Sequence, residues 1–198
     1  MRWWMRQRGV FSLVPGVLVG FWVVLAVTSG KTVAMPSLLA DLVTTRLSDF
    51  ACLAVSTAVV AVLERRLVAA EAAALRRVER MDVVLAAGLS LAASAGALLF
   101  LRGFDSATAL TAARNVLFFC GIALAAWPLL GARASLLPVV WMLVSLLNGH
   151  RSSNDPYPWV IVAEGPYVSY AALGAGLAFL TGLLALALLP RLMTRIRP

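Results

Sequence analysis

The chain has 198 residues, of which 62% are hydrophobic and 13% are charged, and its formal net charge is +8. Soluble domains average about 25% charged residues, so this composition argues against a soluble globular protein. The length suits one membrane domain of six helices with little mass outside the bilayer.

Six apolar stretches alternate with short polar connections, which predicts an all-α polytopic membrane protein. The polar connections are too short to form a soluble domain with a core of its own, so residues 1–198 should form a single transmembrane domain. The expected spans are Val10–Thr28, Leu47–Leu63, Val83–Leu101, Ser106–Leu130, Ser135–Leu147 and Val168–Leu189.

The amino end, residues 1–9, predicts a segment that lies in the lipid headgroup layer. Trp3 and Trp4 stand beside Arg2, Arg6 and Arg8, and indole and guanidinium groups are both favourable at the membrane interface. A secretory signal peptide is the rival interpretation. No small-x-small cleavage site follows the apolar run, so we expect this segment to remain part of the chain.

The connection between the second and third spans, residues 64–82, predicts an amphipathic cytoplasmic helix. It contains no Gly or Pro and is rich in good helix formers. Its apolar residues recur at helical spacing and form a stripe: Leu67, Ala70, Ala74, Val78 and Met81. The remaining surface carries five arginines, namely Arg65, Arg66, Arg76, Arg77 and Arg80.

The segment between the fifth and sixth spans, residues 148–166, combines three prolines with an apolar middle at residues 159–163. Irregular backbone is tolerated at membrane depth only where protein or a water-filled cavity shelters it. We therefore expect this segment to dip into the outer leaflet or to lie on it, sheltered by the protein.

The basic residues predict the orientation. Of the 17 Lys and Arg residues, 12 fall at the two ends of the chain and in the second-to-third and fourth-to-fifth connections. Cytoplasmic loops carry the Lys and Arg excess, so both termini should be cytoplasmic. The remaining five basic residues are balanced by five acidic ones on the other face. The net positive charge then faces anionic lipid headgroups and does not indicate nucleic acid binding.

Arg114 is the strongest single candidate for a functional residue. An arginine inside hydrocarbon costs roughly 2.5–3.5 kcal/mol on insertion scales, so it usually faces protein or water. It could receive an anionic group of a substrate, or it could pair with Asp49, Asp105 or Glu164, with Asn115 adding hydrogen bonds. In the alternative interpretation the fourth span starts at Asn115, and Arg114 extends to the outer interface.

A second polar group surrounds the end of the fifth span: Asn148, His150, Arg151, Asp155 and Glu164. We consider Asn148, His150 and Glu164, together with Arg114 and Asn115, as candidates for a substrate site or an exterior gate. The alternative for this group is an ordinary solvated loop.

Motifs for catalysis are missing from the sequence. The single histidine excludes zinc signatures that need two, and no nucleophile-elbow or phosphate-binding loop pattern is present. Residues 29–32 resemble the end of a phosphate loop but lack its upstream glycine. Cys52 and Cys120 lie in separate apolar spans and should act as small apolar residues. We therefore expect neither an enzyme nor a metal or cofactor in this chain.

The layout resembles the membrane subunit of a type-2 ABC exporter, over the whole chain. Residues 2–11 are similar to the interfacial segment of that family, residues 64–82 to its cytoplasmic elbow, and residues 148–166 to its re-entrant exterior helices. The stretch 113–117, followed by Pro128 and Pro138, is also similar to small actinobacterial permeases. The chain is shorter than usual for the family.

The resemblance implies a heteromeric complex in the bacterial cell membrane. A second permease chain and a separate ATP-binding-cassette subunit, which holds ATP and Mg, are the implied partners. The ATPase would grip the coupling helix 64–82, at the candidate residues Leu67, Glu71, Arg76, Arg77 and Arg80. The expected cargo is amphiphilic or hydrophobic, such as a peptide, a lipid or a natural product. The alternative is a non-transporting accessory or regulatory subunit of a larger membrane complex.

The charge pattern makes a direct prediction about topology. In intact cells, an impermeant thiol reagent should label a cysteine placed at Asn154 and should leave one at Ala72 unlabelled. Labelling at position 72 would overturn the orientation.

Overall fold

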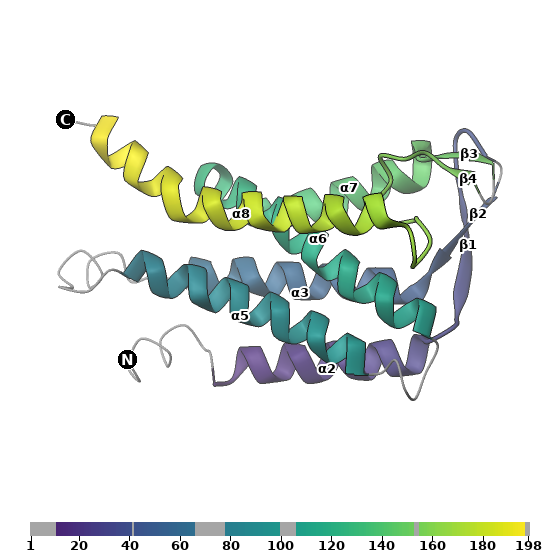
Figure 1. The fold of residues 1–198 in the computed structure, drawn as a ribbon, viewed down its shortest axis with the longest axis horizontal. Helices are drawn as coiled ribbons and strands as arrows, with labels where there is room; N and C mark the ends of the chain where they lie inside the picture. Colours follow the sequence, from purple (N-terminus) through teal and green to yellow (C-terminus); the bar gives the residue numbers. More distant parts are fainter. Residues whose placement is uncertain (1–10, 41, 66–77, 100–105, 153–154, 197–198) are drawn as a thin grey trace.

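The computed structural model describes residues 11–40, 42–65, 78–99, 106–152 and 155–196. Its helices run roughly along one long axis, and two small β-hairpins lie together at one end (Figure 1). We call this the hairpin end. Two predicted features lie outside the described residues: the interfacial segment 1–9 and most of the coupling helix, residues 66–77.

The described part of the chain is mostly helical, as expected. Its α-helices are α2 (Leu13–Thr28), α3 (Leu47–Glu64), α5 (Val78–Leu99), α6 (Ser106–Leu130), α7 (Leu136–Asn148) and α8 (Ser169–Ile196). Four stretches are long and apolar enough to cross a membrane: Leu47–Glu64, Arg80–Leu99, Ser106–Asn148 and Ser169–Leu189.

The six expected spans are therefore confirmed only in part among the described residues. The stretch Ser106–Asn148 contains α6 and α7 joined by the 3-10 helix η2 (Gly131–Ser135), where Gly131 adopts a positive φ of 56°. Helix α2 has 16 residues and α7 has 13. At 1.5 Å per residue these helices are about 24 and 20 Å long, which is less than a hydrocarbon core of about 30 Å.

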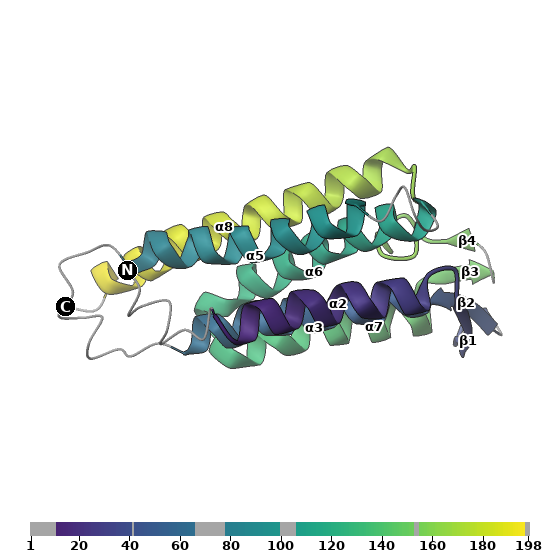
Figure 2. The same cartoon turned by 90° about the horizontal axis from the view of Figure 1, so that it is seen from below.

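Helix α6 lies at the centre of the bundle (Figure 2) and packs against α8, α3, α5 and α7. Phe119 and Leu124 of α6 are fully buried. Helices α6 and α8 approach closely because a Cβ on Gly121 would collide with the backbone of Ala178, and one on Gly182 with the backbone of Gly121. Small residues thus set the contact between these two helices, as is common in membrane helix packing.

The first hairpin was not foreseen by the sequence, which suggested only an exterior loop over residues 29–46. Strands β1 (Thr32–Pro36) and β2 (Leu42–Arg46) are antiparallel, with Thr32 opposite Arg46. The hairpin docks on the end of α7, because the amide of Leu38 donates to the carbonyl of Leu147 at 2.8 Å. Strand β2 runs directly into α3, so the hairpin positions the start of that helix.

The segment 148–166 differs from what the family resemblance implies. It forms the short strands β3 (His150–Ser152) and β4 (Asp155–Pro156), followed by turns; no helix occurs in described residues 155–168. We call residues 157–168 the cap. Its apolar middle is sheltered by protein, since Val160 and Val162 are buried, whereas re-entrant helices are absent there.

Helix α3 ends and α5 begins at the end of the bundle opposite the hairpins (Figure 1). At that opposite end the indole of Trp127 donates to Glu64 Oε1 at 2.6 Å, which ties α3 to α6.

Candidate functional site

A buried polar cluster lies where α6 meets the cap. Arg114 is only 7% exposed and Asn115 is fully buried. Both lie about two turns into α6, on a helix that is otherwise apolar at its centre. The interpretation in which Arg114 extends to the outer interface is therefore wrong, because its side chain is enclosed by the protein.

The Arg114 guanidinium binds the backbone of the cap. Nη1 donates to the carbonyl of Gly165 at 2.8 Å, and Nη2 donates to the carbonyls of Glu164 at 2.9 Å and Val162 at 3.2 Å. Nε donates to Asn115 Oδ1 at 3.2 Å. A guanidinium carries five N–H groups, and these four hydrogen bonds occupy most of them. Arg114 therefore holds the cap and has little capacity left for a substrate.

Asn115 joins the cap to α3. Its Nδ2 group donates to Asp49 Oδ1 at 2.9 Å and to the carbonyl of Val162 at 3.2 Å, while its Oδ1 accepts from Arg114. Asp49 lies in the first turn of α3 and is only 4% exposed. Asn115 thus stands between a buried cation and a buried anion, and every hydrogen-bonding atom of its side chain amide group is used.

Arg46 adds a second cation to this region. It lies at the end of β2, one helical turn before Asp49, and its Nη1 donates to Thr111 Oγ1 of α6 at 2.7 Å. Arg46 and Arg114 both act electrostatically on Asp49. Buried charges are tolerated when they are paired and hydrogen-bonded, and here two cations flank one carboxylate.

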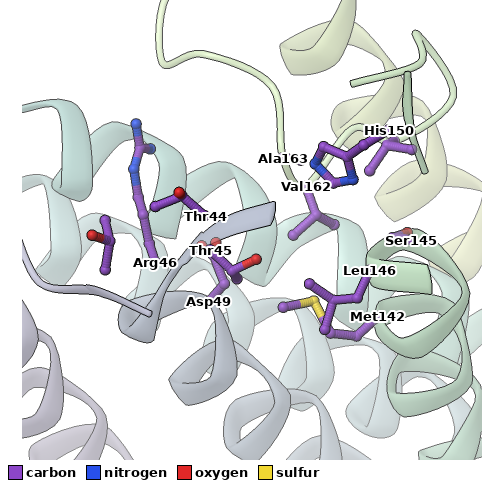
Figure 3. A pocket seen from close by; sticks show the side chains of 12 residues that line it. Thr44, Thr45, Arg46, Asp49, Met142, Ser145, Leu146, His150, Val162 and Ala163 are labelled. Carbon is purple, nitrogen blue, oxygen red and sulfur yellow. The ribbon is translucent and has the colours of Figure 1, made fainter. Parts of the chain in front are cut away.

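A pocket of about 230 Å³ opens beside this cluster (Figure 3). It lies between β2, the start of α3, the end of α7 and the cap. Its polar lining includes Asp49, Ser145 and His150, and its apolar lining includes Met142, Leu146, Val160 and Val162. The remaining lining residues are Thr32, Thr44, Thr45, Arg46 and Ala163.

His150 and Ser145 bring unpaired polar atoms to the pocket. His150 is 4% exposed and Ser145 is 3% exposed. His150 Nδ1 and Ser145 Oγ are buried without a hydrogen-bond partner. Burial lowers the pKa of His150, an effect partly opposed by a hydrogen bond to the backbone of Ser145. The imidazole is therefore mostly neutral at pH 7.

The pocket does not have the geometry of a hydrolytic triad, although it contains a serine, a histidine and an aspartate. A triad needs the serine bonded to the imidazole and the imidazole bonded to the carboxylate. Ser145 Oγ and His150 Nδ1 have no partner, and Asp49 is bonded to Asn115 instead. No group of three His, Cys, Asp or Glu residues suited to a metal ion occurs in the described part of the chain.

The residues proposed from the sequence are only partly brought together. Arg114, Asn115 and the backbone of Glu164 form one cluster, and His150 lines the adjacent pocket. The side chain of Glu164 accepts a hydrogen bond from the Tyr170 hydroxyl. Asn148 is exposed at the end of α7 and takes no part.

Among the coupling candidates, Arg80 is exposed near the start of α5. The others lie outside the described residues: Leu67, Glu71, Arg76 and Arg77.

Sequence reasoning missed most of the pocket. Asp49 was considered only as a partner for Arg114, and Arg46, Ser145 and Thr111 were not considered as site residues. The spacing of Arg46 and Asp49 at the start of an apolar span was the available signal, since a charge pair one turn apart faces one side of a helix. Nothing in the sequence indicated that α7 would bring Ser145 to the same place.

Replacing Arg114 tests its contacts with the cap. Arg114→Leu leaves three cap carbonyls without their donor, and each unsatisfied buried group costs about 1–3 kcal/mol. We expect a lower unfolding temperature in detergent and faster proteolysis within residues 157–168. Arg114→Lys should retain part of the stability, because the charge survives without the guanidinium fork. Exposed Arg133→Leu is the matched control. A cap equally resistant in all three variants would contradict the assignment.

No family model, no curated protein and no solved structure matches this chain. Its function is therefore inferred from the geometry of the described residues and from the sequence.

Proposed function

We propose that this chain is the permease subunit of an ATP-driven exporter in the bacterial cell membrane, of the type-2 ABC kind, which moves an amphiphilic substrate. ATP hydrolysis takes place in a separate subunit that carries the nucleotide and Mg. The observation that carries the proposal is the pocket, in which polar groups and an apolar wall lie side by side at the hairpin end.

The size and lining of the pocket favour part of an amphiphile. Drug-sized ligands occupy pockets of roughly 300–1,000 Å³, and this pocket has about 230 Å³. It suits a head group and the first few carbons of a chain. Met142 and Leu146 offer an apolar surface, while Asp49 and His150 offer polar contacts. With the orientation that the basic residues predict, this pocket lies on the exterior side, where an exporter releases its cargo.

A mechanical connection from the opposite end supports the proposal. The coupling segment 64–82 joins α3 to α5, and both helices pack against α6. Glu64 is bonded to Trp127, and Asp49 at the other end of α3 is bonded to Asn115, so α3 is fixed to α6 at both ends. An ATPase that moves the coupling segment would act on these helices and change the walls of the pocket. Such coupling requires two states with different contacts.

A second copy of the chain is the partner that helix α2 favours. Gly16 and Gly20 are exposed, and a Cβ on either would meet no atom within 4 Å. Small residues four apart allow two membrane helices to approach closely. Large apolar side chains flank them on the same exposed surface, including Val19, Val23 and Val27. In this proposal the substrate path lies between two permease chains.

A non-transporting accessory subunit is the second candidate, and one observation favours it. The Arg114 guanidinium is used almost entirely on the chain's own cap. A rigidly held cap is compatible with a protein that stabilises a larger complex, and it is equally compatible with one that opens and closes a substrate path. Capture of an ATPase and coupling of its activity to substrate distinguish the two candidates.

Charge reversal in the coupling segment tests the permease proposal. An affinity-tagged chain purified from its native membrane should bring an ATPase with it. Arg76→Glu combined with Arg77→Glu should release the ATPase or abolish substrate-stimulated hydrolysis, because the basic surface no longer meets acidic residues of the partner. Arg133→Glu, an exposed reversal elsewhere in the chain, is the control. Unchanged assembly and unchanged coupled hydrolysis in the double variant would refute this docking site.

A further inference from the structure

Three buried polar side chains line the pocket with hydrogen-bonding capacity left over: Asp49, Ser145 and His150. Asp49 Oδ1 accepts one hydrogen bond, from Asn115, and a carboxylate can accept several. Ser145 Oγ and His150 Nδ1 are buried without partners. All three side chains are more than nine-tenths buried. A buried polar atom without a partner costs free energy. Two such atoms beside the Asp49 carboxylate, Ser145 Oγ and His150 Nδ1, indicate a place where a ligand donates hydrogen bonds.

The guanidinium of Arg46, a cation near Asp49, does not bind the Asp49 carboxylate. Arg46 lines the pocket, but its guanidinium is bonded to Thr111 of α6. Figure 3 shows the Arg46 side chain extended away from the Asp49 carboxylate, and it shows His150 entering from the far side of the pocket. The space between Asp49, Ser145 and His150 is therefore left for another donor.

We propose that this pocket binds the primary ammonium group of an amphiphile, with Asp49, Ser145 and His150 accepting its three N–H groups. An ammonium has three donors and no acceptor, one donor for each of these three groups. The alkyl chain attached to it would lie along Met142, Leu146 and Val162. The inference deepens the proposed function, on which it rests, by naming the head group of the cargo.

Other head groups fit less well. An ionised carboxylate or phosphate offers acceptors and no donor, so it cannot donate a hydrogen bond to Asp49 or to an unprotonated nitrogen of His150. A quaternary ammonium has the right charge but cannot donate a hydrogen bond to Ser145 or His150. An alcohol can donate only one hydrogen bond and carries no charge. These differences supply the controls for a binding experiment.

His150 is the single histidine of the chain, which makes it a site-specific probe. The purified full-length chain, labelled with ¹⁵N-histidine and reconstituted in lipid nanodiscs, gives imidazole signals that need no assignment by mutation. The probe ligand is hexylammonium, which is short enough to keep partitioning into lipid low. Hexyltrimethylammonium and hexanol are the matched controls.

We expect hexylammonium to move the signal of His150 Nδ1 upfield in a saturable manner, because an unprotonated nitrogen gains a hydrogen bond. The two control ligands should not reproduce this shift. Asp49→Asn keeps an oxygen for Asn115 but removes the charge, and should weaken binding about tenfold or more. Exposed Asp155→Asn is the matched carboxylate-to-amide control and should bind as the unmodified chain does.

Three results would overturn the inference: no shift with hexylammonium in the folded chain, an equal shift with hexanol or the quaternary amine, or a ligand-free spectrum in which Nδ1 carries the proton. Equal affinity in Asp49→Asn would also contradict it. Because the assay uses this chain alone, its failure is distinct from failure of the transport proposal. An ATPase that still co-purifies would leave that proposal standing without this head group.

Discussion

The contact between Arg114 and the cap carbonyls is the interaction on which the rest of this structure depends. The cap is irregular backbone beside an apolar bundle, and such backbone persists at membrane depth only if its polar groups find partners. Arg114 supplies hydrogen bonds to three cap carbonyls, at Val162, Glu164 and Gly165. With these satisfied, Val160 and Val162 can be buried and can form the apolar wall of the pocket.

The same contact fixes the charge balance of the hairpin end. Arg114 is buried because the cap encloses it, and a buried cation is stable only near a compensating anion. Asp49 provides that charge through the bridge made by Asn115. Asp49 also lines the pocket, together with Ser145 and His150, whose Oγ and Nδ1 atoms have no hydrogen-bond partner. The binding chemistry that we infer follows from how the cap is held.

The sequence predicted the helical class from strong local signals, whereas it left Arg114 open between the protein interior and the outer interface. A long apolar helix can be recognised from composition. An arginine beside an asparagine in an apolar span is energetically unfavourable unless its side chain is hydrogen-bonded. The β1–β2 hairpin was not predicted, since its connection lacks the Asn-Gly or Asp-Gly pairs that mark tight hairpins. The pocket was not predicted because Asp49 and Ser145 come from α3 and α7, and their proximity depends on tertiary packing. The expectation of six spans is not confirmed, because α2 and α7 have only 16 and 13 residues.

A double-mutant cycle between Asp49 and Asn115 tests most directly whether this cluster acts as one unit. The free energy of unfolding would be measured for Asp49→Ala, for Asn115→Ala and for the double variant, in the same detergent. If Asn115 holds α3 and the cap together, either single change already breaks this bridge. The double variant should then lose less free energy of unfolding than the two single variants lose in sum. We predict an interaction energy of about 0.5–3 kcal/mol, the range found for residues in one hydrogen-bonded network. Additive losses would contradict the account, because they would mean that the cap and α3 are stabilised independently.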